Sequence, residues 1–366
     1  SSRSRPTTNS SRRSPSSPRP DVSDTARDSA IRQRTVARAL IRAAMLDGGI
    51  DATAAVNTDL GRFVGLRAGS ALWLSARLEA GETAVSTPAA TGVLGTALSA
   101  VAQSRLRGEA PIEHITIVGD AGTLGVVARQ AAYFSLGIKV VEFDGASFAD
   151  ARPADHLSSR EPSSAHLTLA DVIREAGADV VVEHGVVAGE VNGLEVVRVV
   201  DEDGVAKLRI GVGMHDRETF RMLHGDEVSV EQLRDVVQQV ARHRATGAAA
   251  HPLNRLAPER ALRAEVIAAP HRLDAQSMRT AEPPVARTNL KDSVPCVATA
   301  TLASGEDAVV VFTAGVMVDA VPFAADARDR LNRLARLIVV AEPRNVLPTQ
   351  QHLATMLLQP AVFMSA

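Results

Sequence analysis

Residues 193–213 of the chain read GLEVVRVVDEDGVAKLRIGVG, and this stretch determines the fold predicted for the middle of the chain. Two runs rich in Val, Leu and Ile flank the pair Asp203-Gly204, a strong signal for a tight turn between antiparallel strands. The pattern predicts a β-hairpin with strands over residues 193–200 and 206–212.

Helix and strand signals lie on both sides of this hairpin. Before it, Thr168 begins a helix that Gly177 ends, and residues 180–187 form a further strand. After it, Ser229 begins a helix, with Gln232 at the capping-box position and apolar residues at helical spacing. The sequence therefore predicts an α-β-β-β-α module within residues 166–268.

Acidic residues on the predicted strands give this module a family resemblance. The hairpin and the α-β-β-β-α order resemble the PD-(D/E)XK nuclease superfamily. The resemblance implies a restriction-endonuclease-like fold in which Glu195 and Glu183 are catalytic and hold Mg²⁺, which activates water. The family's acid-x-lysine pattern is missing, because the matching positions hold Arg209-Ile210-Gly211 or Gly211-Val212-Gly213. Lys207, two residues earlier, is expected to share a strand face with Arg209.

The segment after the hairpin, residues 211–218, reads GVGMHDRE. His215 is a candidate catalytic base, and Asp216 is a candidate metal ligand that would join the acids on the strands. In the alternative interpretation, Asp216 caps a short helix and Arg217 pairs with a nearby acid. The sequence leaves both interpretations open.

Residues 25–150 predict a Rossmann-like α/β domain. A helix over residues 31–46 ends at Gly48-Gly49, and residues 70–145 alternate in the order β-α-β-α-β. Parallel strands need crossover connections, so this alternation predicts a parallel sheet with helices on it, in three layers.

A glycine-rich turn follows the second strand of that alternation. Gly119, Gly122 and Gly125 precede or open a helix, and Asp144 ends the next strand. Glycines let a phosphate approach the amides of a helix N-terminus, where an acid on the next strand binds ribose. These four residues are candidates for binding a nucleotide or another anion. The alternative is a helix N-terminus that packs closely on the sheet.

Arginines gather between residues 242 and 263. The cluster consists of Arg242, Arg244, Arg255, Arg260 and Arg263, with Glu259 as its one acid. It predicts either a surface for nucleic-acid phosphate, with Arg255 as a ligand-binding candidate, or a solvated helix face with salt bridges.

The C-terminal residues 292–366 return to α/β character. They are expected either to complete the sheet of the first domain or to form a third small domain. Residues 268–291 are expected to be an irregular connection. Asp319 follows an apolar strand and is a site candidate if that strand end faces a cleft.

Composition narrows the class of protein. Hydrophobic residues make up 45% of the 366 residues and aromatics 3%, so the cores must be built from Ala, Val and Leu. The net charge of −2 gives no general attraction to nucleic acid, and no apolar run is long enough to span a membrane. One cysteine, Cys296, excludes an internal disulfide and favours a cytoplasmic location. The Ala-, Arg- and Val-rich usage is typical of high-GC bacteria such as actinobacteria.

Residues 1–24 predict a disordered basic tail. Ser and Pro dominate it, and its first 20 residues hold arginines but no acid. A nucleic-acid-binding arm and a transit peptide are the alternatives.

Two functional classes follow from these patterns. The favoured one is a non-catalytic or degenerate nuclease-fold protein that binds nucleotide, nucleic acid or a protein partner. The other is a Mg²⁺-dependent phosphodiesterase or nuclease with Glu195, Glu183 and Glu190 as ligands. The missing lysine favours the first class.

Overall fold

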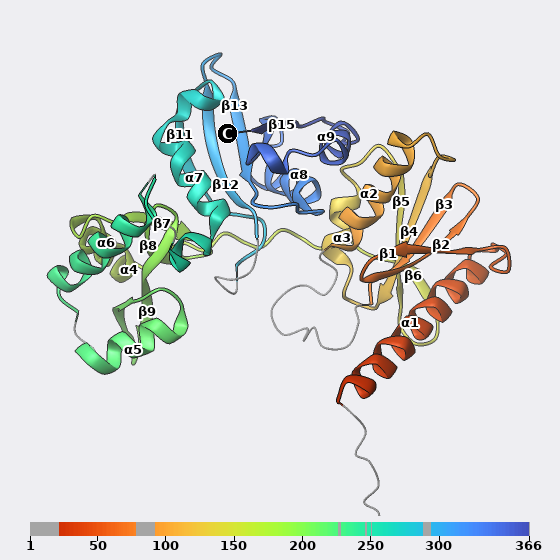
Figure 1. The fold of residues 1–366 in the computed structure, drawn as a ribbon, viewed down its shortest axis with the longest axis horizontal. Coiled ribbons are helices and arrows are strands. Elements are labelled where there is room, and N and C mark those ends of the chain that lie inside the picture. Colours follow the sequence, from red (N-terminus) through yellow and green to blue (C-terminus); the bar gives the residue numbers. More distant parts are fainter. Residues whose placement is uncertain are drawn as a thin grey trace, which may run out of the picture.

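A computed structural model describes residues 22–77, 92–225, 228–245, 247–249, 251–287 and 294–365. The described chain is mixed α/β, as predicted, and its strands form three sheets. We call residues 22–150 the first half, residues 164–255 the inserted module and residues 258–365 the second half. Figure 1 shows the second half between the other two. Residues 1–21 of the predicted basic tail lie outside the described residues. Residues 22–24 begin helix α1, so the prediction of a tail up to residue 24 is wrong at its end.

The first half contains a six-stranded sheet. Its strands, in spatial order, are β1 Val56–Leu60, β2 Phe63–Ala68, β3 Ala71–Ser75, β4 His114–Asp120, β5 Gly137–Phe143 and β6 Phe148–Asp150. Its helices are α1 Val22–Asp47, α2 Val93–Leu106 and α3 Gly125–Ala131. The predicted β-α-β-α-β order is present as β3-α2-β4-α3-β5, with parallel pairing throughout that run.

The sheet as a whole is mixed, which corrects the prediction of a parallel sheet. Tight turns at Gly61 and Gly69 join β1 to β2 and β2 to β3, and such short connections allow only antiparallel pairing. Helix α1 covers one face through Ile41 and Met45, which pack with Trp73. Helices α2 and α3 cover the other face.

The second half forms its own five-stranded sheet and does not complete the first. Its strands are β11 Ala275–Ala281, β12 Cys296–Leu302, β13 Asp307–Phe312, β14 Arg336–Ala341 and β15 Val362–Ser365. Its helices are α7 Pro258–Ala268, α8 Ala320–Leu331 and α9 Pro348–Thr355. The predicted irregular connection at residues 268–291 is wrong where β11 forms, because β11 pairs along its length with β12.

The two halves repeat one topology. In each half a helix precedes three antiparallel strands, and two helices then alternate with two further parallel strands: α1-β1-β2-β3-α2-β4-α3-β5 and α7-β11-β12-β13-α8-β14-α9-β15. Helix α7 covers one face of the second sheet, as α1 does in the first. The other helices merge into one core between the halves.

The junction between the halves has approximate two-fold symmetry. Helix α2 packs on α9, and α3 packs on α8, which are equivalent pairs in the repeat. Between them, Phe134 and Leu357 form an antiparallel bridge. The amide of Ser135 donates to Met356 O, and the amide of Leu358 donates to Tyr133 O, both at 2.9 Å.

The inserted module contains a four-stranded antiparallel sheet. Its elements are α4 Ser164–Glu175, β7 Asp179–Glu183, β8 Val186–Val191, β9 Leu194–Glu202, β10 Val205–Ile210, α5 Met214–His224 and α6 Val230–Arg244. The three-strand prediction is wrong, because the predicted strand 180–187 turns back at His184-Gly185, where both residues have positive φ. The hairpin at Asp203-Gly204 and the Ser229 capping box are confirmed.

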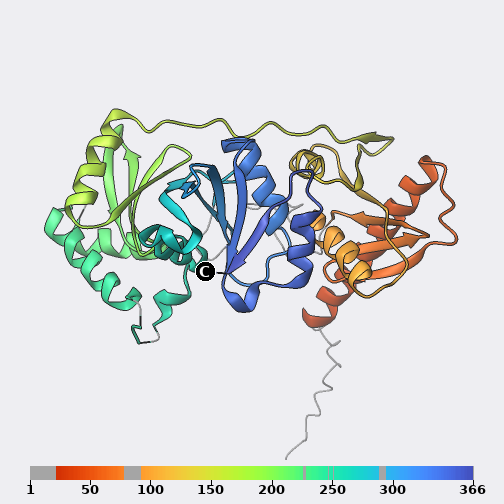
Figure 2. The ribbon, with the colours of Figure 1, turned by 90° about the horizontal axis from the view of Figure 1, so that it is seen from above.

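The module's boundaries also differ from the prediction. Ser163, not Thr168, caps α4, and its side chain accepts from the amide of His166. Helix α7 lies outside the module, because it packs on the second sheet. An extended segment over residues 151–163 runs from the first half past the second half to the module (Figure 2). Among the described helices, none has the length and hydrophobicity needed to cross a bilayer.

Candidate functional site

Glu183 and Glu190, two of the acids predicted to bind Mg²⁺, face helix α7 of the second half. Arg263 places Nη1 3.1 Å from Glu183 Oε1 and Nη2 3.1 Å from Glu190 Oε2. Arg260 also contacts both carboxylates. Arg263 is 1% exposed and Glu190 3%, so the charges are sealed from water. We call these four residues the carboxylate–arginine cluster.

Local structure places these side chains. Hairpin β7–β8 brings the end of one strand and the body of the next to the same side, and the three-residue spacing of Arg260 and Arg263 puts both on one face of α7. Burial alone would raise the pKa of Glu183, but the charges of Arg260 and Arg263 outweigh it and hold that pKa below its ordinary value. The Glu183 carboxylate is therefore ionised and paired with both arginines.

Glu195 is paired separately. It lies on β9 opposite Glu190 of β8, next to a bulge at which β9 has one extra residue, Val196. Arg198 donates to both of its oxygens at 2.9 Å, and Arg217 Nη1 donates to Oε1 at 3.0 Å. Such bidentate arginine contacts occupy the lone pairs that a metal ion would need.

The predicted metal ligands do not come together. Asp216 is exposed, and its Oδ2 accepts from the amide of Val212 at 2.7 Å. His215 is exposed on the first turn of α5. Within the described ranges, no group of three or more His, Cys, Asp or Glu residues is arranged to hold a metal ion. The alternative interpretation is confirmed in part: a short helix forms and Arg217 pairs with Glu195, but the N-cap of the helix is Gly213 and not Asp216.

The cations at and near the position of the missing lysine also have an acidic partner. Lys207 Nζ lies 3.9 Å from Glu202 Oε2, and Arg209 contacts the same carboxylate. The two cations do share a strand face, as expected. Glu202 ends β9, whereas Glu195 lies near its beginning, so these cations serve a different acid.

The glycine-rich turn is occupied by a side chain of the protein itself. Glu142 on β5 accepts from the amides of Gly122 at 3.0 Å and Leu124 at 2.8 Å. A phosphate would need those amides. A Cβ at Gly125 would come within 2.9 Å of Ala154, and one at Gly119 within 3.0 Å of Leu124, so these positions need small residues for close packing.

Asp144 has a local role in the turn between β5 and β6. Its Oδ1 accepts from the amides of Ala146 and Ser147, both at 2.8 Å. Hydrogen bonds from Ser147 and then Ala146 lower the pKa of Asp144. The carboxylate thus stabilises the turn in which Asp144 itself lies.

Three of the five arginines in the predicted surface form contacts within the protein. Arg260 and Arg263 belong to the buried cluster, and Arg244 donates to Asn192 O, Leu253 O and Leu256 O at 2.7–3.0 Å. Arg255 and Arg242 remain exposed.

Apart from Arg217, sequence reasoning missed the arginines as partners of the acids. Arg198 lies three residues from Glu195 and offered a local signal, since i and i+3 charges on a bulged strand can meet. Arg260 lies far along the chain from Glu183, and only the packing of α7 joins them. No protein-family model matches the chain, and no curated protein sequence matches it.

Proposed function

We propose that this chain is a non-catalytic binding protein whose inserted module attaches a protein partner through helix α5. The observation that carries the non-catalytic part is the pairing of Glu183, Glu190 and Glu195 with arginines. A nuclease needs such acids free to hold a metal ion. Here Glu183 and Glu190 fasten the module to α7 of the second half, and Glu195 is paired within the module.

The proposal also includes a fold type for two parts of the chain: Rossmann-like for the first half and nuclease-like for the inserted module. The run β3-α2-β4-α3-β5, with α1 on the opposite face, supports a Rossmann-like first half. The module keeps the acidic hairpin of a nuclease-like scaffold. Its four-stranded sheet and its occupied acids support a scaffold that has lost the chemistry.

Exposed apolar side chains point to α5 as the partner surface. Met214 is 76% exposed, Met222 75% and Leu223 74%, and α5 contains no buried residue. Methionine-rich surfaces adapt to protein partners. A nucleic-acid partner is less well supported, because most of the arginine cluster is used internally.

Capture experiments test the partner surface. Wild-type protein and the double variant Met222→Asp/Leu223→Asp are used as baits, with Leu334→Asp as the matched control, because Leu334 is 90% exposed on the second half. The proposal expects a saturable protein partner that the control retains and the double variant loses. Equal capture by both variants contradicts it.

Calorimetric titration tests the alternative, a Mg²⁺-dependent phosphodiesterase. The proposal expects no saturable binding of Mg²⁺ or Mn²⁺ at millimolar concentration. Saturable binding that Glu195→Ala abolishes, together with metal-dependent cleavage of DNA or RNA, would replace the proposal with the alternative.

A further inference from the structure

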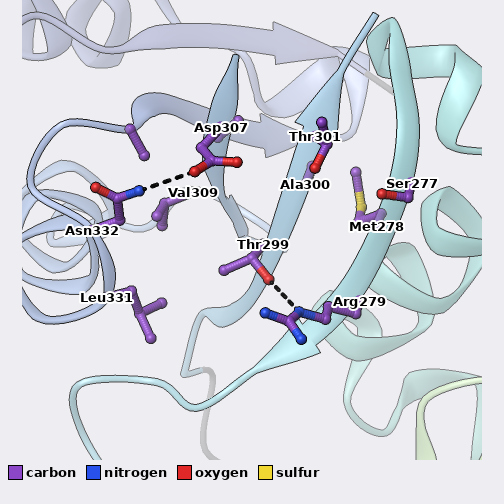
Figure 3. A pocket seen from close by; sticks show the side chains of 12 residues that line it. Ser277, Met278, Arg279, Thr299, Ala300, Thr301, Asp307, Val309, Leu331 and Asn332 are labelled. Carbon is purple, nitrogen blue, oxygen red and sulfur yellow. Dashed lines mark hydrogen bonds between the residues drawn. The ribbon is translucent and has the colours of Figure 1, made fainter. Parts of the chain in front are cut away.

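The second half contains a pocket on the face of its sheet. It has a volume of about 420 Å³ and lies where strands β11, β12 and β13 extend past the end of α8 (Figure 3). Cavities of this size fall within the range of small-molecule sites. None of the sequence motifs discussed above lies in it.

Strand register gives the pocket its polar lining. Ser277 pairs with Thr301, Arg279 pairs with Thr299, and Thr301 pairs with Asp307, so the side chains of all five residues lie on one face of the sheet. This face carries hydroxyls, one guanidinium and one carboxylate. Leu331 and Ala335 supply an apolar wall.

Arg279 is held in the pocket without a carboxylate partner. Its Nε donates to Thr299 Oγ1 at 3.2 Å. In the described part of the chain no acid pairs with it, and Figure 3 shows its guanidinium directed into the pocket. The two Nη groups remain for an oxyanion, which guanidinium binds in bidentate fashion.

The opposite end of the pocket offers acceptors. Asp307 Oδ2 accepts from Asn332 Nδ2 at 3.3 Å. By strand geometry, Arg279 and Asp307 lie two strands and two residues apart, or about 12 Å between Cα atoms.

The repeat shows that the equivalent place in the first half is filled. There Arg67 on β2 takes the position of Thr299, as the strand pairings Arg67–Leu72 and Thr299–Val309 indicate. Arg67 donates to Gly69 O and to Ala110 O, in the loop after α2.

Loop length explains the difference between the halves. The loop after α2 spans residues 107–113, whereas the loop after α8 spans only residues 332–335. The shorter loop and the small Thr299 leave the second half open where the first is closed. In the first half, the Arg67 side chain and the longer loop therefore take the place that corresponds to the pocket of the second half.

We propose that this pocket binds a small hydroxylated anion of the sugar monophosphate class. The phosphate is bound by Arg279 and Thr299, and the sugar hydroxyls by Asp307 and Ser277. Phosphate monoesters suit a guanidinium flanked by hydroxyl donors. This proposal is independent of the α5 surface, and either can fail without the other.

Calorimetry on the full chain tests it with ribose 5-phosphate, ribose and inorganic phosphate as probes. We expect saturable binding of ribose 5-phosphate, with affinity at least tenfold above that of either fragment. Arg279→Met should weaken that binding more than tenfold. The control Arg336→Met removes an exposed arginine at the start of β14 and should leave binding unchanged.

Thr299→Arg gives a second, independent variant. It copies the first half by placing an arginine in the opening, and it should block ribose 5-phosphate while the thermal unfolding midpoint stays the same. Absence of binding to wild type at millimolar ribose 5-phosphate overturns the proposal. So does binding that survives both Arg279→Met and Thr299→Arg in folded protein.

Discussion

Arg129 on α3 and Asp326 on α8 form a buried bidentate ion pair across the junction of the two halves. Nε lies 2.8 Å from Oδ1, and Nη2 lies 2.9 Å from Oδ2. Asp326 is fully buried, and Tyr133 adds a hydrogen bond at 3.3 Å. This buried ion pair lies beside the apolar core between the halves and fixes how α3 and α8 meet.

Arg129→Met should strongly destabilise the protein. Removing one member of a buried pair leaves the other charge without compensation, which costs about 3–5 kcal/mol. Urea unfolding measures the loss. The control is Arg333→Met, because Arg333 is 74% exposed where it pairs with Asp329, and such pairs contribute about 0–1 kcal/mol. Similar losses in the two variants would show that Asp326 finds other partners.

Arg263→Met should loosen the attachment of the inserted module. It leaves Glu183 and Glu190 partly unpaired against α7, with an expected loss of about 3–5 kcal/mol. Since the pKa of Glu183 is lowered in the folded state, this stabilisation is present above the carboxylate's ordinary pKa and is lost as the pH falls through the folded value. Unfolding in urea at neutral and acidic pH measures both effects.

The pH dependence of the loss in Arg263→Met distinguishes charge pairing from packing. The difference between wild type and Arg263→Met should shrink as the pH falls below the ordinary carboxylate pKa toward the lower folded pKa of Glu183. Arg272→Met, which removes a more exposed arginine paired with Glu265, is the control and should change little. A pH-independent difference would mean that Arg263 acts through packing alone.

The sequence predicted those elements whose signals are local. The apolar strands β4 and β5, the Asp203-Gly204 turn and the Ser229 capping box were all predicted and are all present. Strand β11 was missed because Gln276, Ser277 and Arg279 make it polar, as suits a strand at the sheet edge. Its pairing with β12 is a tertiary effect.

The candidate sites required information that no local pattern contains. Glu142 fills the glycine-rich turn only because β5 lies beside β4, and sequence spacing did not indicate which carboxylate would reach the amides. Arg260 looked like a surface cation on a helix. It is buried because α7 packs between its own sheet and the module's acids.

Asp319 should make stability depend on pH in the opposite sense to Glu183. Burial raises the pKa of Asp319 to about 6, although hydrogen bonds from the amides of Gly95 and Gly92 act against it. Between about pH 4 and 6 the folded state keeps a proton that the unfolded chain releases, so stability falls as the pH rises through this window.

Asp319→Asn should remove that slope. At pH 7 the variant should be more stable than wild type, by up to about 3 kcal/mol for a two-unit pKa difference, and near pH 4 the two should agree. The amide oxygen can still accept from Gly95, whose amide lies 3.0 Å from Oδ1. Asp150→Asn, at a 75% exposed position, is the control. A variant less stable than wild type at pH 7 would show that the ionised carboxylate itself is needed.

Gly193 and Gly204 offer a matched test of how closely the module approaches α7. Both follow a residue with positive φ in a hairpin turn, and both have φ of 75°. Replacing either with Ala forces a Cβ into the left-handed region, at about 1–2 kcal/mol. A Cβ at Gly193 would also lie 2.2 Å from Arg260 O, whereas none of the described atoms lies within 4 Å of one at Gly204.

Gly193→Ala should therefore cost about 1–3 kcal/mol more than Gly204→Ala in urea unfolding, because the backbone of α7 must move away. Since that movement pulls Arg260 from the acids, Gly193→Ala should also increase proteolysis between the module and α7. Equal losses in the two alanine variants would mean that the turn at Gly193 does not pack on α7.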